Sequence, residues 1–192
     1  MTKLRKWSIL THLVEQMRQS GSWSGETHVQ KAVFFLQELT EVNLGFEFML
    51  YKHGPFSFDL TDELGMLKSA RVLDPEPQAP YGPRLKPLKR FDDLSEGERD
   101  RIRFVASALG ERGVGSLEQI GTALLVRAEG IPRPTEQESA RLLELKPHLT
   151  QEQADEAFRE LNLIIQRFQT ERPGGGQPPA RLLETCHQVS PV

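Results

Sequence analysis

Apolar residues recur at helical spacing along most of the chain. In the segment 3–18, Trp7, Val14 and Met17 fall on one stripe of a helix. The next predicted helix, which Ser24 is placed to cap, carries apolar residues around most of its circumference. A helix with so wide an apolar surface is expected near the centre of the fold, buried on more than one side.

The stretch that follows predicts β-structure and a turn. Residues 46–51 are rich in aromatic side chains, which favour a strand, and Gly54-Pro55 then forces a turn. Ser57 is placed to cap a third helix, in which leucines recur at positions i, i+4 and i+7.

Two further strands are expected at 71–73 and 83–88. The loop between them, 74–82, contains three prolines, which argue against a tight two-residue turn. The order helix, helix, strand, helix and two-stranded ribbon is that of a winged helix, in which the ribbon is the wing. The predicted fold class is therefore mainly α with a small β wing (α+β), winged-helix-like in its N-terminal half.

The second half of the chain carries four helix-start signals, each a Ser or Thr followed three residues later by Glu or Gln. At this spacing the hydroxyl accepts a bond from a free backbone N–H while the longer side chain reaches back. The four pairs are Ser95 with Glu98, Ser116 with Gln119, Thr135 with Glu138, and Thr150 with Gln153. Since an apolar stripe follows each pair, we expect four helices.

These elements predict three parts of the chain. A winged-helix-like half covers 1–91, and a helical extension at 92–170 packs on it to form one compact unit. A flexible tail follows at 171–192, because its glycine and proline runs order poorly. One stretch of the tail, Arg181-Leu182-Leu183, is apolar enough to dock as a short peptide.

Composition sets limits on the function without naming one. The chain has 192 residues, 38% of them hydrophobic, and a net charge of −3, which excludes nucleic-acid binding by bulk positive charge alone. A single cysteine excludes a disulfide framework and a thiolate zinc site. No apolar run reaches the roughly 20 residues of a membrane helix, and no apolar signal core is present. We therefore expect a cytoplasmic protein with no membrane partner.

Positive charge nevertheless gathers on the predicted wing. Its basic residues are Arg71, Arg84, Lys86, Lys89 and Arg90, and they are candidates for contacts to nucleic-acid phosphates. The third helix, which enters the major groove in a winged helix, is acidic at its start. Its carboxylates are Asp59, Asp62 and Glu63. Phosphates would repel them, whereas the helix macrodipole favours them.

The sequence does not assemble an active site. His53 lies at a turn, where a histidine bonded to backbone is the common explanation. Cys186 stands beside a histidine, but in the predicted tail, where a nucleophile lacks rigid positioning. The acidic run 92–100 fits the start of a helix, and no histidine pair has metal-ligand spacing. We expect no enzyme and no bound cofactor or metal.

Four stretches, taken in order, resemble those of the YwgA-like uncharacterised bacterial and archaeal proteins. Residues 25–36 (GETHVQKAVFFL) resemble that family's Leu-Gln-Lys-x-x-Tyr-x-Leu helix, and residues 51–57 (YKHGPFS) its Tyr-Gly-Pro-Tyr-Ser turn. Residues 117–123 (LEQIGTA) resemble its Leu-Glu-x-x-Ala-Thr helix, and residues 143–150 (LELKPHLT) its Leu-Lys-Pro-His-Phe-Ser link. The first of these helices is shared more loosely with the SocA-like (Panacea) antitoxin domains.

The resemblance implies a winged-helix-like fold with a helical extension. Through the antitoxin domains it also implies a regulatory or defence-associated role, exercised on a protein partner or by self-association, and it implies no enzymatic activity. The alternative is a transcriptional regulator that binds nucleic acid through the basic wing and the basic N-terminus, at Lys3, Arg5 and Lys6.

Part of the resemblance has a physical explanation of its own. Six residues are expected to form a structural motif: Gln30, Lys31, Tyr51, Gly54, Pro55 and Ser57. A buried Gln30 needs a hydrogen-bond partner, and the backbone of the Gly54-Pro55 turn is the candidate. Such a bond would fasten the second helix to the turn that precedes the third.

Overall fold

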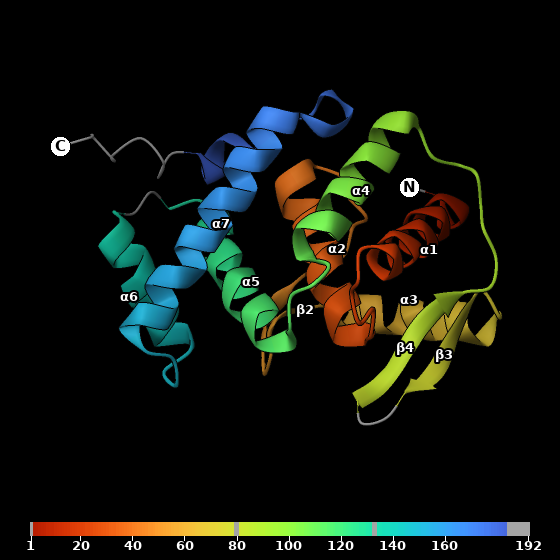
Figure 1. Ribbon diagram of the computed structural model, residues 1–192, viewed down its shortest axis with the longest axis horizontal. Coiled ribbons are helices and arrows are strands. Elements are labelled where there is room, and N and C mark those ends of the chain that lie inside the picture. The colour runs from red at the N-terminus through yellow and green to blue at the C-terminus, as the bar shows by residue number, and fades with distance from the viewer. Residues whose placement is uncertain (1, 79–80, 132–133, 184–192) are drawn as a thin grey trace.

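The computed structural model describes residues 2–78, 81–131 and 134–183. Within these ranges the chain is mainly helical with two small antiparallel sheets, which confirms the α+β fold class, while the winged-helix arrangement stays a prediction (Figure 1). The elements are α1 (Lys3–Gln19), α2 (Glu26–Thr40), β1 (Met49–Tyr51), β2 (Gly54–Phe56), α3 (Phe58–Ser69), β3 (Leu73–Gln78), β4 (Tyr81–Pro87), α4 (Glu96–Leu109), α5 (Val114–Ala128), α6 (Thr135–Leu145), α7 (Gln151–Glu171), and the 3₁₀ turns η1 (Pro173–Gly175) and η2 (Ala180–Leu182).

Helix α2 lies at the centre of the core, as its wide apolar surface predicts. All residues from 28 to 36 are buried, because α1, α4, α5 and strand β2 pack around this helix. The second half of the chain thus packs directly on the first, through α4 and α5. Figure 1 shows α5, α6 and α7 side by side at one end and the β3–β4 ribbon at the other.

The β3–β4 ribbon occupies much of the stretch for which a proline-rich loop was predicted. Apart from residues 79–80, which the structure does not describe, the strands extend through that stretch. Pro75 pairs with Leu85, whose N–H points away from β3 and donates to the carbonyl oxygen of Ser24 at 3.0 Å. Pro75 therefore occupies a position where the ladder needs no donor, and such positions tolerate proline.

Of the four predicted capping boxes, two are confirmed and two are wrong. Complete capping boxes form at Ser95 and at Thr150. The box predicted at Ser116 is wrong because α5 already starts after Gly113, and the box predicted at Thr135 is wrong because α6 starts after Pro134. Two further serine caps were also predicted. The Ser57 hydroxyl caps α3 as expected, whereas the N-cap residue of α2 is Gly25 instead of Ser24.

A buried ion pair and its neighbouring hydrogen bond join α5, α6 and α7. The guanidinium of Arg127 on α5 binds both carboxylate oxygens of Glu138 on α6, at 2.8 and 3.0 Å, and both side chains are 2% exposed. Arg127 also donates to Asn162 on α7 at 2.6 Å and lies over the ring of Phe158. Each of the three guanidinium nitrogens thus forms a hydrogen bond, and the buried charge is paired.

The predicted flexible tail is packed as far as the structure describes it. After α7, Gly174 lies so close to Gly97 of α4 that a Cβ on it would stand 2.3 Å from the Gly97 carbonyl oxygen. Leu182 is fully buried, and Arg181 pairs with Glu38 at 2.8 Å. The stretch expected to dock as a peptide therefore does so, and the glycine-rich segment before it packs on α4. Residues 184–192 lie outside the described ranges.

Candidate functional site

The four stretches that carry the family resemblance meet at one place, the two-residue turn between β1 and β2. This β1–β2 hairpin lies against α2 and α5, and the link between α6 and α7 reaches it as well. The four stretches are separate in the sequence, so only the tertiary structure brings them together.

Gln30 fastens α2 to the residue that caps α3. Its side-chain oxygen accepts from the Ser57 N–H at 2.9 Å, and its amide nitrogen donates to the Ser57 carbonyl at 2.9 Å and to Thr61 at 3.1 Å. The expected partner was the Gly54-Pro55 turn, but the bonds go to Ser57. The amide is therefore satisfied on both sides, which accounts for a glutamine in an apolar helix.

Lys31 binds the turn itself. Its side chain is 1% exposed, and its Nζ donates to the carbonyl oxygen of Pro55 at 2.8 Å. Burial lowers the pKa of Lys31 from 10.5 to about 8, with Glu118 opposing and Lys146 adding to the drop. An amine in this position stays charged near neutral pH at a cost in stability.

A second buried lysine, Lys146, holds the other side of the hairpin. Its Nζ donates to the carbonyl oxygens of Lys52 and Tyr51 at 2.8 and 3.3 Å, and to Glu118 at 2.7 Å. The second oxygen of Glu118 lies 3.3 Å from Nδ1 of His53. Partial burial raises the pKa of Glu118, but the hydrogen bond and charge of Lys146 together with the contact to His53 outweigh it, so the pKa lies below its ordinary value. One carboxylate thus balances two lysines.

Two glycines allow the hairpin to lie directly on α5. Gly54 has φ +81°, and a Cβ on it would stand 3.1 Å from the Glu118 carbonyl oxygen. Gly121 on α5 faces Pro55, whose Cδ would be 3.3 Å from an added Cβ. Close approach of the backbone is a common reason for glycine. We call Lys31, Lys146, Glu118 and these contacts the lysine tether of the hairpin.

The outer face of the hairpin carries an exposed cluster of apolar side chains. Strand alternation puts Met49 and Tyr51 on that face together with Phe56, which pairs across from Met49. Phe58, the first residue of α3, completes the cluster, with ring centroids 5.0 Å from Phe56 and 5.7 Å from Tyr51. Met49, Tyr51 and Phe58 are 55%, 46% and 54% exposed. We call these four residues the aromatic patch.

The basic residues of the predicted wing are mostly engaged within the protein. Arg84 points inward, donating to the carbonyl oxygens of Trp23 and Ser22 at 3.2 Å each. Lys86 pairs with Glu76 at 3.1 Å, and Arg90 pairs with Glu15. The remaining two, Arg71 and Lys89, are exposed and form no ion pair with the described residues.

The basic residues at the N-terminus are likewise engaged. Arg5 pairs with Glu98 at 2.6 Å, and the Nζ of Lys6 lies 4.4 Å from the ring centroid of Phe46. Lys3 lies over the ring of Trp7 at 4.9 Å. Neither the wing nor the N-terminus therefore presents a continuous row of free cations along the described surface.

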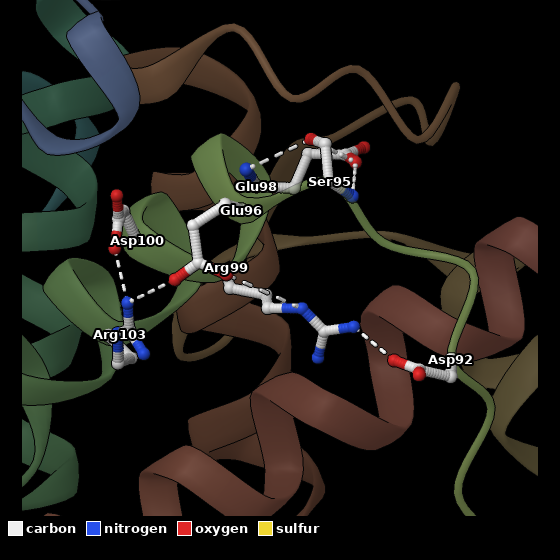
Figure 2. Close-up of polar contacts among 7 residues, drawn as sticks. All are labelled: Asp92, Ser95, Glu96, Glu98, Arg99, Asp100 and Arg103. Atoms are coloured by element: carbon white, nitrogen blue, oxygen red, sulfur yellow. Dashed lines mark hydrogen bonds and ion pairs between the residues drawn. The ribbon is translucent and has the colours of Figure 1, made fainter.

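The acidic run before and within α4 forms a capping and ion-pair network (Figure 2). Glu98 accepts from the N–H and the hydroxyl of Ser95, at 2.9 and 2.7 Å. Arg99 reaches back to Asp92, and Arg103 binds Glu96 and Asp100. These contacts agree with the structural interpretation of the run.

The described residues contain neither a group of metal-binding side chains nor a membrane-spanning helix. In ranges 2–78, 81–131 and 134–183, no three His, Cys, Asp or Glu side chains are grouped to hold a metal ion. None of the helices there has the length and apolar character to span a bilayer. Cys186 lies outside these ranges.

Sequence reasoning pointed to Lys31 and the turn but assigned no role to Glu118, Lys146 or Phe58. The first two lie within stretches that carry the family resemblance, which was the available signal for them. Phe58 gave no signal, because its partners become apparent only once the strand register is known.

Comparison with known proteins adds no relative. A scan against models of protein families finds no match to the chain, and searches of curated proteins and of solved structures find none either. The family resemblance stays a prediction, and the geometry of the hairpin is the basis for function.

Proposed function

We propose that this chain is a non-enzymatic protein-interaction module that binds its partner through the aromatic patch. The observation that carries the proposal is the exposure of three large side chains, Met49, Tyr51 and Phe58, in one contiguous cluster. Single exposed apolar residues are common, whereas clusters of aromatic side chains are typical of binding surfaces. Tyrosine, phenylalanine and methionine are also enriched where proteins meet.

The rigid support of the patch favours the same role. A hairpin with three-residue strands is not stable alone. The lysine tether and Gln30 bind it to α2, to α5 and to the link between α6 and α7. A preorganised surface loses little conformational entropy on binding. The resemblance to SocA-like antitoxin domains supports a regulatory partner, and the engaged cations of the wing favour a protein over nucleic acid.

Site-specific photo-cross-linking tests the proposal. Phe58 is replaced by p-benzoyl-phenylalanine in the cells that produce the protein, and cross-linked species are identified after irradiation. We expect one protein to be captured reproducibly from position 58 and lost when Tyr51→Ser is added. Both positions are exposed, so the variants are expected to keep the fold, which their melting temperatures check.

Leu163 on α7 provides the matched control. It is the most exposed of the large apolar side chains, at 65%, and it lies outside the patch. Capture of the same protein from positions 58 and 163 would show non-specific contact. If no protein is captured from position 58, or if capture survives Tyr51→Ser, the aromatic patch is not the binding surface.

A further inference from the structure

The surface beside the aromatic patch indicates the chemistry of its partner. Resting on the proposed function, we infer that the patch and the outer face of α3 bind a cationic amphipathic segment, in which Arg or Lys stands within one helical turn of an apolar anchor. Four observations lead to this partner: the charge of α3, a hollow beside it, the aromatic rings, and the mismatch with a second copy.

The outer face of α3 is acidic and apolar in alternation. Phe58, Asp62 and Met66 recur every four residues and are all exposed, and Asp59 is exposed beside them. Among the described residues, no ion pair involves Asp59 or Asp62. Glu63, by contrast, is buried and accepts from the indole N–H of Trp7 at 2.5 Å. The two free carboxylates are therefore available to cations of a partner.

A hollow next to this face offers a place for an apolar anchor. It measures about 510 Å³ and lies between α1 and α3, with Trp7, Asp62 and Met66 in its lining. Its walls thus combine an indole, a thioether and one carboxylate with the ammonium of Lys3, which lies over the Trp7 ring. An aliphatic or aromatic side chain entering it would bring a neighbouring residue of the partner close to Asp62.

The aromatic patch suits the same kind of segment. The faces of Tyr51 and Phe58 can attract a guanidinium by cation–π interaction, and arginine uses this contact more often than lysine. Asp59, next in sequence to Phe58, adds an opposite charge at the same place. Arginine can thus bind a ring and a carboxylate together, a combination that an acidic or neutral segment lacks.

A second copy of this chain fits the surface poorly. In a two-fold symmetric dimer the same patch faces itself, so Asp59 and Asp62 of both copies would lie close together. Like charges across an interface oppose binding. The exposed carboxylates therefore favour a basic partner over self-association, and they disfavour nucleic acid for the same reason.

Selection from a random peptide library tests the inference. A phage-displayed library is panned against the intact chain at low salt, and synthetic peptides from the enriched pool are measured by fluorescence anisotropy. We expect the enriched peptides to carry Arg or Lys within about four positions of Leu, Phe or Trp. We also expect their affinity to fall about tenfold in Asp59→Asn/Asp62→Asn, and to weaken with added salt.

The control variant is Glu136→Gln/Glu152→Gln. These are exposed carboxylates in the first turns of α6 and α7, as Asp59 is in the first turn of α3, so the variant loses the same charge elsewhere. Its peptide affinity should stay within about twofold of the parent. An equal loss in both double variants would overturn the inference, since general charge would then explain the binding.

The remaining outcomes distinguish the inference from the proposed function. If the peptides lose affinity in Phe58→Ser but carry no basic residue, the partner chemistry is wrong while the patch remains a binding surface. If no peptide depends on Phe58 and position 58 cross-links no protein, the proposed function itself fails. A dimer in sedimentation that Phe58→Ser dissociates would make the occupant a second copy and overturn the inference.

Discussion

Replacing Lys31 by methionine tests whether the lysine tether keeps a charge buried. Methionine has a similar length and no charge, so Lys31→Met removes the ammonium while filling much of its volume. In the parent the Nζ is enclosed by the Pro55 carbonyl and the surroundings of α5, and burial lowers its pKa from 10.5 to about 8. This drop corresponds to about 3 kcal/mol of stability lost while the amine is charged.

The effect of pH on stability follows from this difference in pKa. Between about pH 8 and pH 10.5 the unfolded chain holds the Lys31 proton while the folded protein releases it. Because the unfolded state then binds more protons, the free energy of unfolding rises with pH in this window. From about pH 6.5 to about pH 9.5 the parent should gain about 2 kcal/mol relative to Lys31→Met.

Urea unfolding of both proteins at the two pH values measures this gain. Near pH 6.5 the variant also loses the bond to Pro55, which leaves a buried carbonyl unpaired at a cost of about 1–3 kcal/mol. The two effects oppose each other there, so the decisive quantity is the change in the difference between the proteins, which cancels the titration of all other groups. Lys52→Met, which removes an exposed lysine of the same hairpin, controls for the loss of one positive charge.

A difference that stays constant with pH would refute this account of Lys31. A difference that moves in the opposite direction would show that the amine gains more from Glu118 and Pro55 than it loses by burial. The same pair of proteins also links the tether to binding. If the hairpin loosens in Lys31→Met, cross-linking from position 58 should weaken even where the fold survives.

Five further substitutions test other parts of the structure. Arg127→Met should lower the free energy of unfolding by about 3–5 kcal/mol in urea, since it leaves its carboxylate partner buried and unpaired; a loss below about 1 kcal/mol would contradict full burial of the pair. Gly174→Ala should expose the C-terminal segment to limited proteolysis, because its Cβ would collide with backbone of α4; unchanged resistance would mean that the segment is not held there. Ser95→Ala should cost about 1 kcal/mol and Ser116→Ala less, because the first caps a helix and the second does not; equal losses in thermal melts would argue against this difference. Arg84→Glu should lower the melting temperature, since Arg84 binds two carbonyl oxygens of the loop between α1 and α2; a stable variant would place this arginine at the surface.

Local signals in the sequence predicted elements better than their ends. The apolar breadth of α2 correctly placed it in the core, because a helix can only satisfy such a surface by being enclosed. Capping patterns at Ser95 and Ser116 look alike in sequence, yet Gly113 lets α5 begin two residues before Ser116. The residue at which a helix begins depends on the chain before the helix. The spacing of a Ser or Thr and the following Glu or Gln does not contain that information.

Prolines misled the prediction of the wing for a related reason. Residues 74–82 were expected to form a loop, and their three prolines were taken to argue against a tight two-residue turn. In an antiparallel pair, however, every second residue has no ladder bond, and Pro75 falls on such a residue opposite Leu85. The register that decides this is set by the contacts of β4 with α1 and with Ser24, which lie far away in sequence.

The candidate site was predictable on one side only. Gln30 and Lys31 stand out because polar residues in an apolar helix need partners, and the nearby turn was the obvious place to look. Lys146 lies 94 residues from the carbonyl that it binds at Lys52, so no local pattern reveals the contact. The aromatic patch likewise depends on a register that pairs Met49 with Phe56.

The shortness of β1 and β2 explains both the buried charges beneath the hairpin and the rings exposed on its outer face. Strands β1 and β2 form only three residue pairs, ladder bonds alternate along an antiparallel pair, and strands this short do not hold their shape alone. Apolar packing beneath the hairpin would bury it without fixing its orientation, because dispersion contacts are not directional. The ammonium groups of Lys31 and Lys146 instead bind the carbonyls of Pro55, Tyr51 and Lys52 at defined points. The outer face is thereby held in place from within, and large apolar side chains can remain exposed there without the hairpin collapsing to cover them.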